Sequence, residues 1–304
     1  MQCITEQSGC LLRPTCVTIG KFDGFHAGHR KLLSVLLEHK TEEMDSCVVS
    51  IRTGFLATGQ QIYTEEEQRF LCETMGIDYL AEYDLRNGMR DMEPEQFIAD
   101  YIIKQLHALV IVIGEDFHFG KGRSGDVAML QRLQEKYHYT TVVVPAVSSG
   151  GEKISSTRIR KLLQEGDIET ANRLLKRQYM VLGEIVHGKQ LGAKLGFPTI
   201  NVVPPEKKAL PAYGVYATKV KVGGFWYYGV SNVGVRPTVE SVSTASVETN
   251  LIHCNEDLYG KEAQIYFLKF LRPERKFDSL TALKEQIEKD RKMVEELYKT
   301  EALY

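Results

Sequence analysis

The segment TIGKFDGFHAGHRKLL (18–33) predicts a strand, a tight glycine-containing turn and a helix that begins near His29. Strand patterns of the same kind occur at 16–19, 47–51, near Tyr79, at ALVIVIG (108–114) and at TTVVVP (140–145). Helical patterns separate them, near 32–37, 64–76, 96–106 and 126–137. Strands that alternate with helices of this length predict an α/β fold with a Rossmann-like parallel sheet and helices on both faces.

The pattern changes near Gln178, after the helical stretch IETANRLLKR. Short β-like runs broken by Gly, Pro and Asn then follow, among them YGVYATKVKV, FWYYGVSNVGV, SVETNLIHC and AQIYFLKF. This spacing predicts a small antiparallel β-barrel. The stretch SLTALKEQIEKDRKMVEELYK predicts a terminal amphipathic helix, with Leu280, Leu283, Ile287 and Val294 on one face. We therefore expect two domains, residues 1–178 and 179–304.

The composition is that of a soluble globular protein. Of the 304 residues, 43% are hydrophobic and 26% are charged, and the net charge is -2. No apolar run approaches the roughly 20 residues that span a bilayer, and the start MQCITEQSGC does not resemble a signal peptide. The six cysteines are scattered, without metal-binding or redox spacing. We expect a cytoplasmic protein with reduced thiols and with neither nucleic acid nor membrane as a partner.

Two segments of the first domain point to phosphate binding. A helix N-terminus favours anions, and His26 and His29, with Gly28 between them, add side-chain donors there. ISSTRIRKLL (154–163) opens another helix with the capping hydroxyls of 155–157 and with Arg158 and Arg160 in its first turns. Cations oppose the dipole at a helix N-terminus, so a bound anion is the simpler explanation. The alternative is a pair of surface histidines beside a turn.

HAGH after a strand, with SSTxxR opening a later helix, resembles the nucleotidyltransferase superfamily. GKFDGFHAGH and GEDFHFGKGRSGD (114–126) are similar to the FMN-adenylylating module of bacterial bifunctional riboflavin kinase/FAD synthetases. The motifs cover most of residues 15–165. The resemblance implies ATP binding by a set of turn and helix residues: Gly20, Phe22, Asp23, His26, Gly28, His29, Ser156, Thr157 and Arg160. It also implies that His26 and His29 act in catalysis and that Asp116 and Phe117 lie in the nucleotide or flavin cleft.

The sequence departs from that family after its second strand. The family continues into a Phe-x-Pro-His-Pro motif that shapes the flavin site, whereas this chain reads VVSIRTGFLATGQQ (48–61), without either proline. The loop therefore has different backbone restraints. Either FMN is held by other contacts, with Phe55 and Arg52 as candidates, or adenylylation has weakened.

The segment GEIVHGKQLGAKLGFPTINV (183–202) suggests a second phosphate site. Gly188, Gly192 and Gly196 allow backbone N–H groups to approach phosphate oxygens. Thr199 and Asn201 follow with hydroxyl and amide oxygens, the kind of ligand that Mg²⁺ prefers. For the glycines alone, a set of β-turns is the structural alternative.

GFPTIN is similar to the GFPTAN signature of riboflavin kinases, and the resemblance covers nearly all of residues 180–292. It implies that Thr199 and Asn201 ligate magnesium and that Glu248 is the general base for the riboflavin 5′-hydroxyl. A neutral alcohol benefits from such a base by about 10² to 10⁴ in rate. The alternative is a solvent-facing glutamate on a strand.

Two further assignments come from the same resemblance. Arg275, Lys276 and Phe277 are similar to the family's flavin-contacting segment, although they could equally lead into the last helix. Lys194 would bind phosphate near a position where relatives often place an arginine, but it lacks the forked geometry of that residue.

The sequence thus predicts an enzyme with two Mg²⁺- and ATP-dependent steps. Riboflavin and ATP give FMN and ADP in the C-terminal domain, and FMN and ATP give FAD and pyrophosphate in the N-terminal domain. One alternative is a riboflavin kinase with lost or altered adenylyltransferase activity. Another is a non-catalytic flavin-binding regulator, although a sensor need not keep Glu248, Thr199 and Asn201.

Overall fold

A computed structural model describes residues 1–52, 60–188, 196–236, 244–254 and 256–301. The chain forms two compact units. One consists of Met1–Gln61 with Glu65–Ser156, and the other of Ile62–Thr64 with Thr157–Tyr304. This division places two helices that precede residue 178 with the second unit. The expected functional boundary at residues 178 and 179 remains a prediction.

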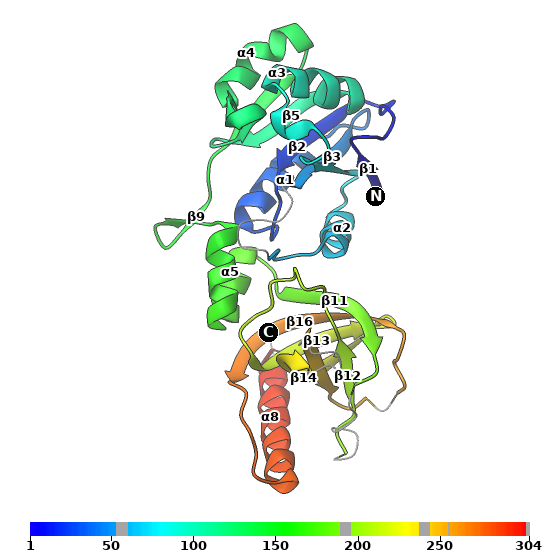
Figure 1. The fold of residues 1–304 in the computed structure, drawn as a ribbon, viewed down its shortest axis with the longest axis vertical. Coiled ribbons are helices and arrows are strands. Elements are labelled where there is room, and N and C mark those ends of the chain that lie inside the picture. The colour runs from blue at the N-terminus through cyan, green and yellow to red at the C-terminus, as the bar shows by residue number, and fades with distance from the viewer. Residues whose placement is uncertain (53–59, 189–195, 237–243, 255, 302–304) are drawn as a thin grey trace. The chain divides into compact units, whose positions relative to one another are not determined.

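The first unit is built on a six-stranded parallel sheet with the order β1-β4-β3-β2-β5-β8 (Figure 1). Its strands are β1 (Gln2–Thr5), β2 (Thr15–Gly20), β3 (Asp45–Arg52), β4 (Tyr79–Asp84), β5 (Ala108–Gly114) and β8 (Thr140–Val144). Its helical segments are α1 (Ala27–His39), α2 (Glu65–Thr74), η1 (Met89–Asp91), α3 (Pro94–Phe97), η2 (Ile98–Gln105), η3 (Lys121–Arg123) and α4 (Val127–Tyr137). Two small hairpins join β6 (His118–Phe119) with β7 (Gly125–Asp126) and β9 (Ser148–Ser149) with β10 (Glu152–Lys153). The predicted α/β fold is confirmed.

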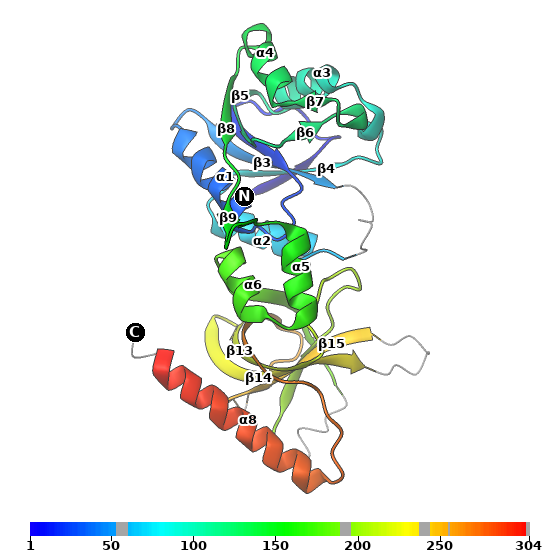
Figure 2. The same ribbon diagram turned by 90° about the vertical axis from the view of Figure 1, so that its left-hand side faces the viewer.

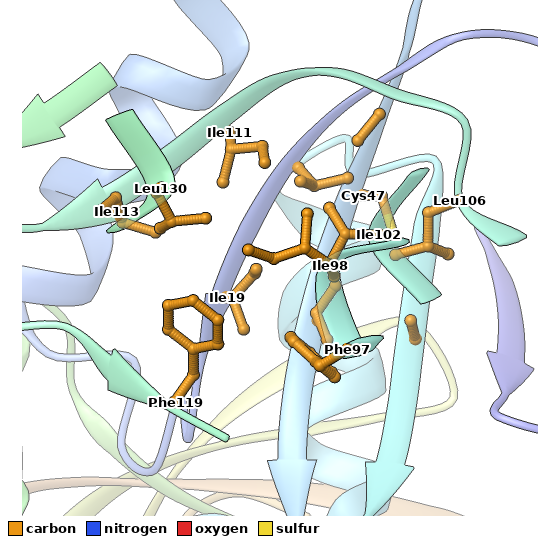
Figure 3. Packing of buried hydrophobic residues seen from close by; sticks show 14 of the residues in the cluster. Ile19, Cys47, Phe97, Ile98, Ile102, Leu106, Ile111, Ile113, Phe119 and Leu130 are labelled. Atoms are coloured by element: carbon orange, nitrogen blue, oxygen red, sulfur yellow. The ribbon is translucent and has the colours of Figure 1, made fainter. Parts of the chain in front are cut away.

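Alternating apolar residues build the core on one face of this sheet. Ile19 of β2, Cys47 of β3 and Ile111 of β5 pack with Ile98 and Ile102 of η2 (Figure 3). Residues two apart in a strand point to the same face, so each strand contributes a row of side chains. Because all six strands are parallel, their carboxyl ends share one edge, and ligands of such sheets bind outside that edge.

The second unit is a closed antiparallel barrel with the order β11-β12-β15-β14-β13-β16. Its strands are β11 (Tyr179–Val186), β12 (Thr199–Val202), β13 (Gly214–Val222), β14 (Phe225–Arg236), β15 (Thr244–Leu251) and β16 (Glu262–Arg272). Its helices are α5 (Ser156–Glu165), α6 (Ile168–Leu175) and α8 (Leu280–Glu301). The predicted barrel with a terminal helix is confirmed.

Helix α8 runs along the outside of the barrel and is drawn in red in Figures 1 and 2. Val294 is 1% exposed and packs against Val215, Ala217 and Val230 of strands β13 and β14. Leu280, which was expected on one face with Val294, is 59% exposed: as the first residue of the helix, it lies outside the cluster around Val294. Among the described residues, no helix is both long and apolar enough to cross a membrane.

Candidate functional site

The turn between β2 and α1 is held in an unusual backbone conformation. Phe22 and Phe25 have φ values of 46° and 43°, and both side chains are fully buried. Bulky residues rarely adopt positive φ, so the packing of the two rings must maintain this turn. Gly20 permits close packing at its start, since a Cβ there would lie 3.2 Å from the Phe22 ring. The turn also buries Asp23, and it leads into the N-terminus of α1.

His26 and His29 form a stacked pair at that helix terminus. Helix α1 begins at Ala27, with His26 as its N-cap, and His26 Nδ1 accepts a hydrogen bond from the backbone N–H of His29 at 3.4 Å. The two ring centroids are 3.8 Å apart. A Cβ at Gly28 would lie 3.2 Å from the His26 ring, so glycine leaves room for the stack.

Both imidazoles are neutral at neutral pH. Burial lowers the pKa of His26 from its ordinary value of 6.5 to about 4, and the charge of Lys153 acts in the same direction. Burial also lowers the pKa of His29 well below 6.5. His29 Nδ1 is buried and has no hydrogen-bond partner among the described residues. A neutral ring still has one N–H donor, so the pair can donate hydrogen bonds to an anion without carrying charge.

Ser156 is joined to the turn by a direct hydrogen bond. Its hydroxyl donates to the backbone oxygen of Asp23 at 2.6 Å, within the first unit. Thr157 and Arg160 follow in α5 and belong to the second unit, where Arg160 donates to Thr157 Oγ1 at 3.4 Å. The structure therefore brings Ser156 together with the β2–α1 turn.

Asp116 and Phe117 follow the carboxyl end of β5. Asp116 forms an ion pair with Lys153, and the hydrogen bond from Lys153 lowers the pKa of that carboxyl. Phe117 stacks on Phe119, with the ring centroids 5.4 Å apart. The sequence did not single out Lys153, which influences both Asp116 and His26.

Arg52 ends strand β3 at the carboxyl edge of the sheet and pairs with Glu82 of β4. Glu82 has a side chain only 5% exposed, and it also accepts from Arg69 Nη2 of α2 at 2.5 Å. The two guanidinium groups neutralise one buried carboxylate and leave one net positive charge. Phe55, the other candidate for holding FMN, lies outside the described residues.

In the barrel, three polar side chains lie in one row across adjacent strands. Asn201 of β12 pairs with Glu248 of β15, which pairs with Asn232 of β14. Their neighbours Val202, Val247 and Val233 are fully buried, so the polar row lies on the opposite face of the strands. The hydroxyl of Thr199 donates to Glu248 Oε1 at 2.8 Å. The barrel therefore brings Thr199, Asn201 and Glu248 together.

Gly188 provides the space for Asn201. A Cβ at Gly188 would lie 2.3 Å from the Asn201 amide nitrogen, so only glycine fits without displacing that amide. Gly196 has a φ of 88°, a conformation that favours glycine. Gly192 and Lys194 lie outside the described residues. Within the described ranges, no three His, Cys, Asp or Glu side chains gather as metal ligands.

A pocket of about 290 Å³ lies beside Thr199. Its walls include Ile185, Ile200 and Leu258, with Tyr259 contributing an aromatic ring. The Tyr259 ring lies 3.8 Å from that of His187, centroid to centroid. Tyr259 was not among the predicted site residues, and the sequence signal for it was an aromatic residue within NEDLYGK.

Side-chain contacts that could not be predicted from the sequence fix the segment between β16 and α8. Arg275 lies over the Phe277 ring, 4.7 Å from its centroid, and donates to Gln286 of α8. Glu274 accepts from Asn232 Nδ2 at 2.8 Å, which places this segment next to the polar row that contains Glu248. Long-range pairs of this kind leave no local sequence pattern.

Comparisons with known proteins agree with both units. The family model described as FAD synthetase matches residues 10–158, and the one described as riboflavin kinase matches residues 175–298.

A protein of Escherichia coli (strain K12), named bifunctional riboflavin kinase/FMN adenylyltransferase, is 34% identical over 301 residues, which is 96% of this chain and 94% of that protein. A Bacillus subtilis (strain 168) protein of the same name is 34% identical and covers 90% of each chain. A crystal structure titled macrolide-efflux protein, from Streptococcus pneumoniae, has a TM-score of 0.85 and 27% identity, and covers 96% of this chain and 98% of its own.

Proposed function

Because the chain belongs to the family of bifunctional riboflavin kinase/FMN adenylyltransferases, we propose that its second unit phosphorylates riboflavin to FMN and its first unit converts FMN to FAD. Enzyme activity of both kinds agrees with the two family models and with the named relatives. The observation that carries the residue assignment is the hydrogen bond between Thr199 and Glu248, because it joins an expected metal ligand to an expected base.

In the kinase step, a carboxylate oxygen of Glu248 accepts the proton of the riboflavin 5′-hydroxyl. The hydroxyl oxygen attacks the γ-phosphorus of ATP, the bond to the β,γ-bridging oxygen breaks, and ADP leaves. The hydrogen bond from Thr199 orients Glu248, so the base does not have to be ordered during the reaction. A positioned base of this kind contributes about 10² to 10⁴ in rate.

The donor set beside Glu248 fits Mg²⁺. Thr199 supplies a hydroxyl oxygen whose hydrogen is already directed at Glu248, and Asn201 supplies an amide oxygen, so both offer lone pairs to a hard cation. Bound there with ATP, Mg²⁺ would neutralise charge on the phosphate oxygens. Gly188 keeps the Asn201 amide in its place, since any larger residue would occupy that space.

We assign the pocket beside Thr199 to the adenosine part of ATP. Its lining combines apolar side chains and Tyr259 with two carboxyl side chains, Glu256 and Asp257, and it includes the proposed metal ligand Thr199. A purine gains from an apolar cavity with an aromatic wall. The segment with Arg275 and Phe277 would contact riboflavin near Asn232 of the polar row, which binds Glu274 of the same segment.

In the adenylylation step, an ionised phosphate oxygen of FMN attacks the α-phosphorus of ATP, and pyrophosphate leaves. No side-chain base is needed. The N-terminus of α1 and the N–H groups of His26 and His29 stabilise charge on the ATP phosphates. Arg52, held by Glu82 at the carboxyl edge of the sheet, is the described candidate for an FMN contact in place of the missing Pro-His-Pro loop.

The test is incubation of the purified protein with riboflavin and MgATP, with FMN and FAD separated over time, and a parallel reaction started from FMN. We expect FMN first and FAD later. FMN without FAD in both reactions would leave only the kinase, and the absence of both products would overturn the proposed function.

A further inference from the structure

Two consecutive residues of α8, Asp290 and Arg291, each bind a residue of a different barrel strand. Arg291 Nη1 donates to Asn250 Oδ1 of β15 at 2.9 Å. Asp290 accepts from Arg272, the last residue of β16, through Nη2 at 2.8 Å. Asp290 is 1% exposed, so this carboxylate is fully enclosed by its partners. Neither residue has a role in the reaction proposed above.

Arg291 connects through Asn250 to Pro198, the residue before Thr199 of β12. Asn250 is 4% exposed, and its Nδ2 donates to the backbone oxygen of Pro198 at 2.8 Å. Asn250 also lies opposite Thr199 in the β12–β15 ladder. The Arg291 guanidinium lies over Phe197, 5.5 Å from the ring centroid. Hydrogen bonds therefore connect α8 through Asn250 to Pro198, and the next residue, Thr199, donates to Glu248.

The bond from Arg291 determines which way the Asn250 amide faces. An amide has a donor end and an acceptor end, and Asn250 uses both: Oδ1 toward Arg291 and Nδ2 toward Pro198. Without the guanidinium the amide can rotate, which would turn an oxygen toward the Pro198 oxygen and break that contact. The loop would then lose the restraint next to the proposed metal ligand.

Asp290 connects in the same way to the segment proposed to contact riboflavin. Gln286, one turn earlier in α8, donates from Nε2 to Asp290 Oδ1 at 2.6 Å. This bond fixes the Gln286 amide so that its oxygen accepts from Arg275. The Arg275 guanidinium in turn covers the Phe277 ring.

We propose that α8 positions both halves of the kinase site, Arg291 acting through Asn250 on Pro198, next to Thr199, and the Asp290–Gln286 pair acting on the segment of Arg275. This inference rests on the proposed kinase function. These are positioning residues, because they act through Asn250 and Arg275 and not on substrate. We expect variants in the two sets of contacts to have different kinetic defects. A general loss of folding would not produce such a difference.

The first test is Arg291→Met in the full chain, assayed as a kinase with varied MgATP and riboflavin. We expect kcat to fall about tenfold and the Mg²⁺ concentration for half-maximal rate to rise, because small displacements of reacting groups are costly. The KM for riboflavin should stay within about twofold of wild type, since a contact remote from the flavin segment changes its binding little. Arg291→Lys keeps the positive charge but lacks the planar guanidinium, so its kcat should lie between those of Arg291→Met and wild type.

Lys292→Met is the matched control, because Lys292 is an exposed cation on the same helix, next to Arg291. It should behave as wild type. A double-mutant cycle with Asn250→Ala and Arg291→Met should be strongly non-additive if the two act as one path. Additive effects, or equal rates for Arg291→Met and Lys292→Met, would overturn the role of Arg291.

The second half is tested by Gln286→Met, which removes the contact to Arg275 without leaving a charge unpaired. We expect the KM for riboflavin to rise about fivefold to tenfold, as for loss of one contact to a charged group, with Mg²⁺ dependence unchanged. Identical defects in Gln286→Met and Arg291→Met would contradict two separate paths. Adenylylation of supplied FMN should be normal in every variant. FMN formation by the wild-type enzyme checks the proposed function itself, so its failure is distinguishable from failure of this inference.

Discussion

Thr199 of β12 and Glu248 of β15 are joined by a 2.8 Å hydrogen bond between adjacent strands of a closed barrel. Because backbone ladders hold both strands, the distance between these side chains is set by the barrel and not by a loop. The residue that would accept a proton and the residue that would hold a cation are therefore placed before any substrate arrives.

Replacing Glu248 with Gln should remove the base and keep its shape. We expect the kinase kcat to fall by about 10² to 10⁴, while adenylylation of supplied FMN is unchanged. The measurement is the initial rate of FMN formation at saturating riboflavin. Glu262→Gln is the control, since Glu262 is an exposed glutamate on β16. A kinase rate in Glu248→Gln equal to that of the control would rule out the proposed base.

Substitution of His29 should separate the two activities in the opposite direction. His29→Asn removes the ring that stacks on His26, and with it one proposed donor to the ATP phosphates. We expect FAD formation from FMN to fall about 10- to 100-fold, while FMN formation stays at the wild-type rate. His39→Gln, at the other end of α1, is the control. Parallel loss of the kinase would argue against separate sites.

The proximity of residues within one short motif could be predicted from the sequence. His26, Gly28 and His29 fall within four positions, so strand, turn and helix place them together without any long-range information. Glu248 is 49 residues from Thr199, and its assignment depended on the family resemblance, which the register of β12 and β15 supports. The expected helix start near His29 was two residues late, because His26 caps α1 with its own side chain.

The sequence could not predict the partners that fix these motifs. Lys153 pairs with Asp116 across 37 residues, and Arg291 reaches Asn250 across 41. Such pairs depend on how strands and helices pack, and neither partner has a distinctive neighbour in the sequence. The Arg52–Glu82 pair could not be predicted for the same reason, although Arg52 stands where the family has its Phe-x-Pro-His-Pro motif.

A methyl group at Gly188 should damage the kinase selectively. In Gly188→Ala the new Cβ would be 2.3 Å from the Asn201 amide nitrogen, so that amide must move. We expect kcat to fall at least about tenfold and the requirement for Mg²⁺ to increase, because displaced ligands bind a cation poorly. Gly9→Ala, where a Cβ would meet nothing within 4 Å, is the control. Normal Mg²⁺ dependence in Gly188→Ala would show that Asn201 does not bind the metal.

Arg52 is expected to contribute to FMN binding. Arg52→Met should raise the KM for FMN in the adenylylation reaction about tenfold, the effect of losing one hydrogen bond to a charged group. Arg69 remains beside Glu82, so the buried carboxylate keeps a partner. Arg86→Met is the control, because Arg86 pairs with Asp84 on the surface of the same sheet. An unchanged KM would leave Arg52 as a structural partner of Glu82 alone.

The buried histidine pair should make the first unit sensitive to acid. The pKa of His26 is about 4 in the folded chain and near 6.5 when unfolded, so between these values the unfolded chain binds the extra proton. The free energy of unfolding therefore falls as pH drops from 6.5 to 4, and His26 accounts for about 3 kcal/mol of that loss. His26→Asn, which keeps a side chain suited to the N-cap, should show a weaker pH dependence. Amide hydrogen exchange of β2 measures the pH dependence of unfolding in the first unit. The fluorescence of Trp226, the single tryptophan of the chain, follows unfolding of the second unit and serves as the internal control. Equal pH dependence of β2 exchange in both proteins would show that His26 is not the titrating group.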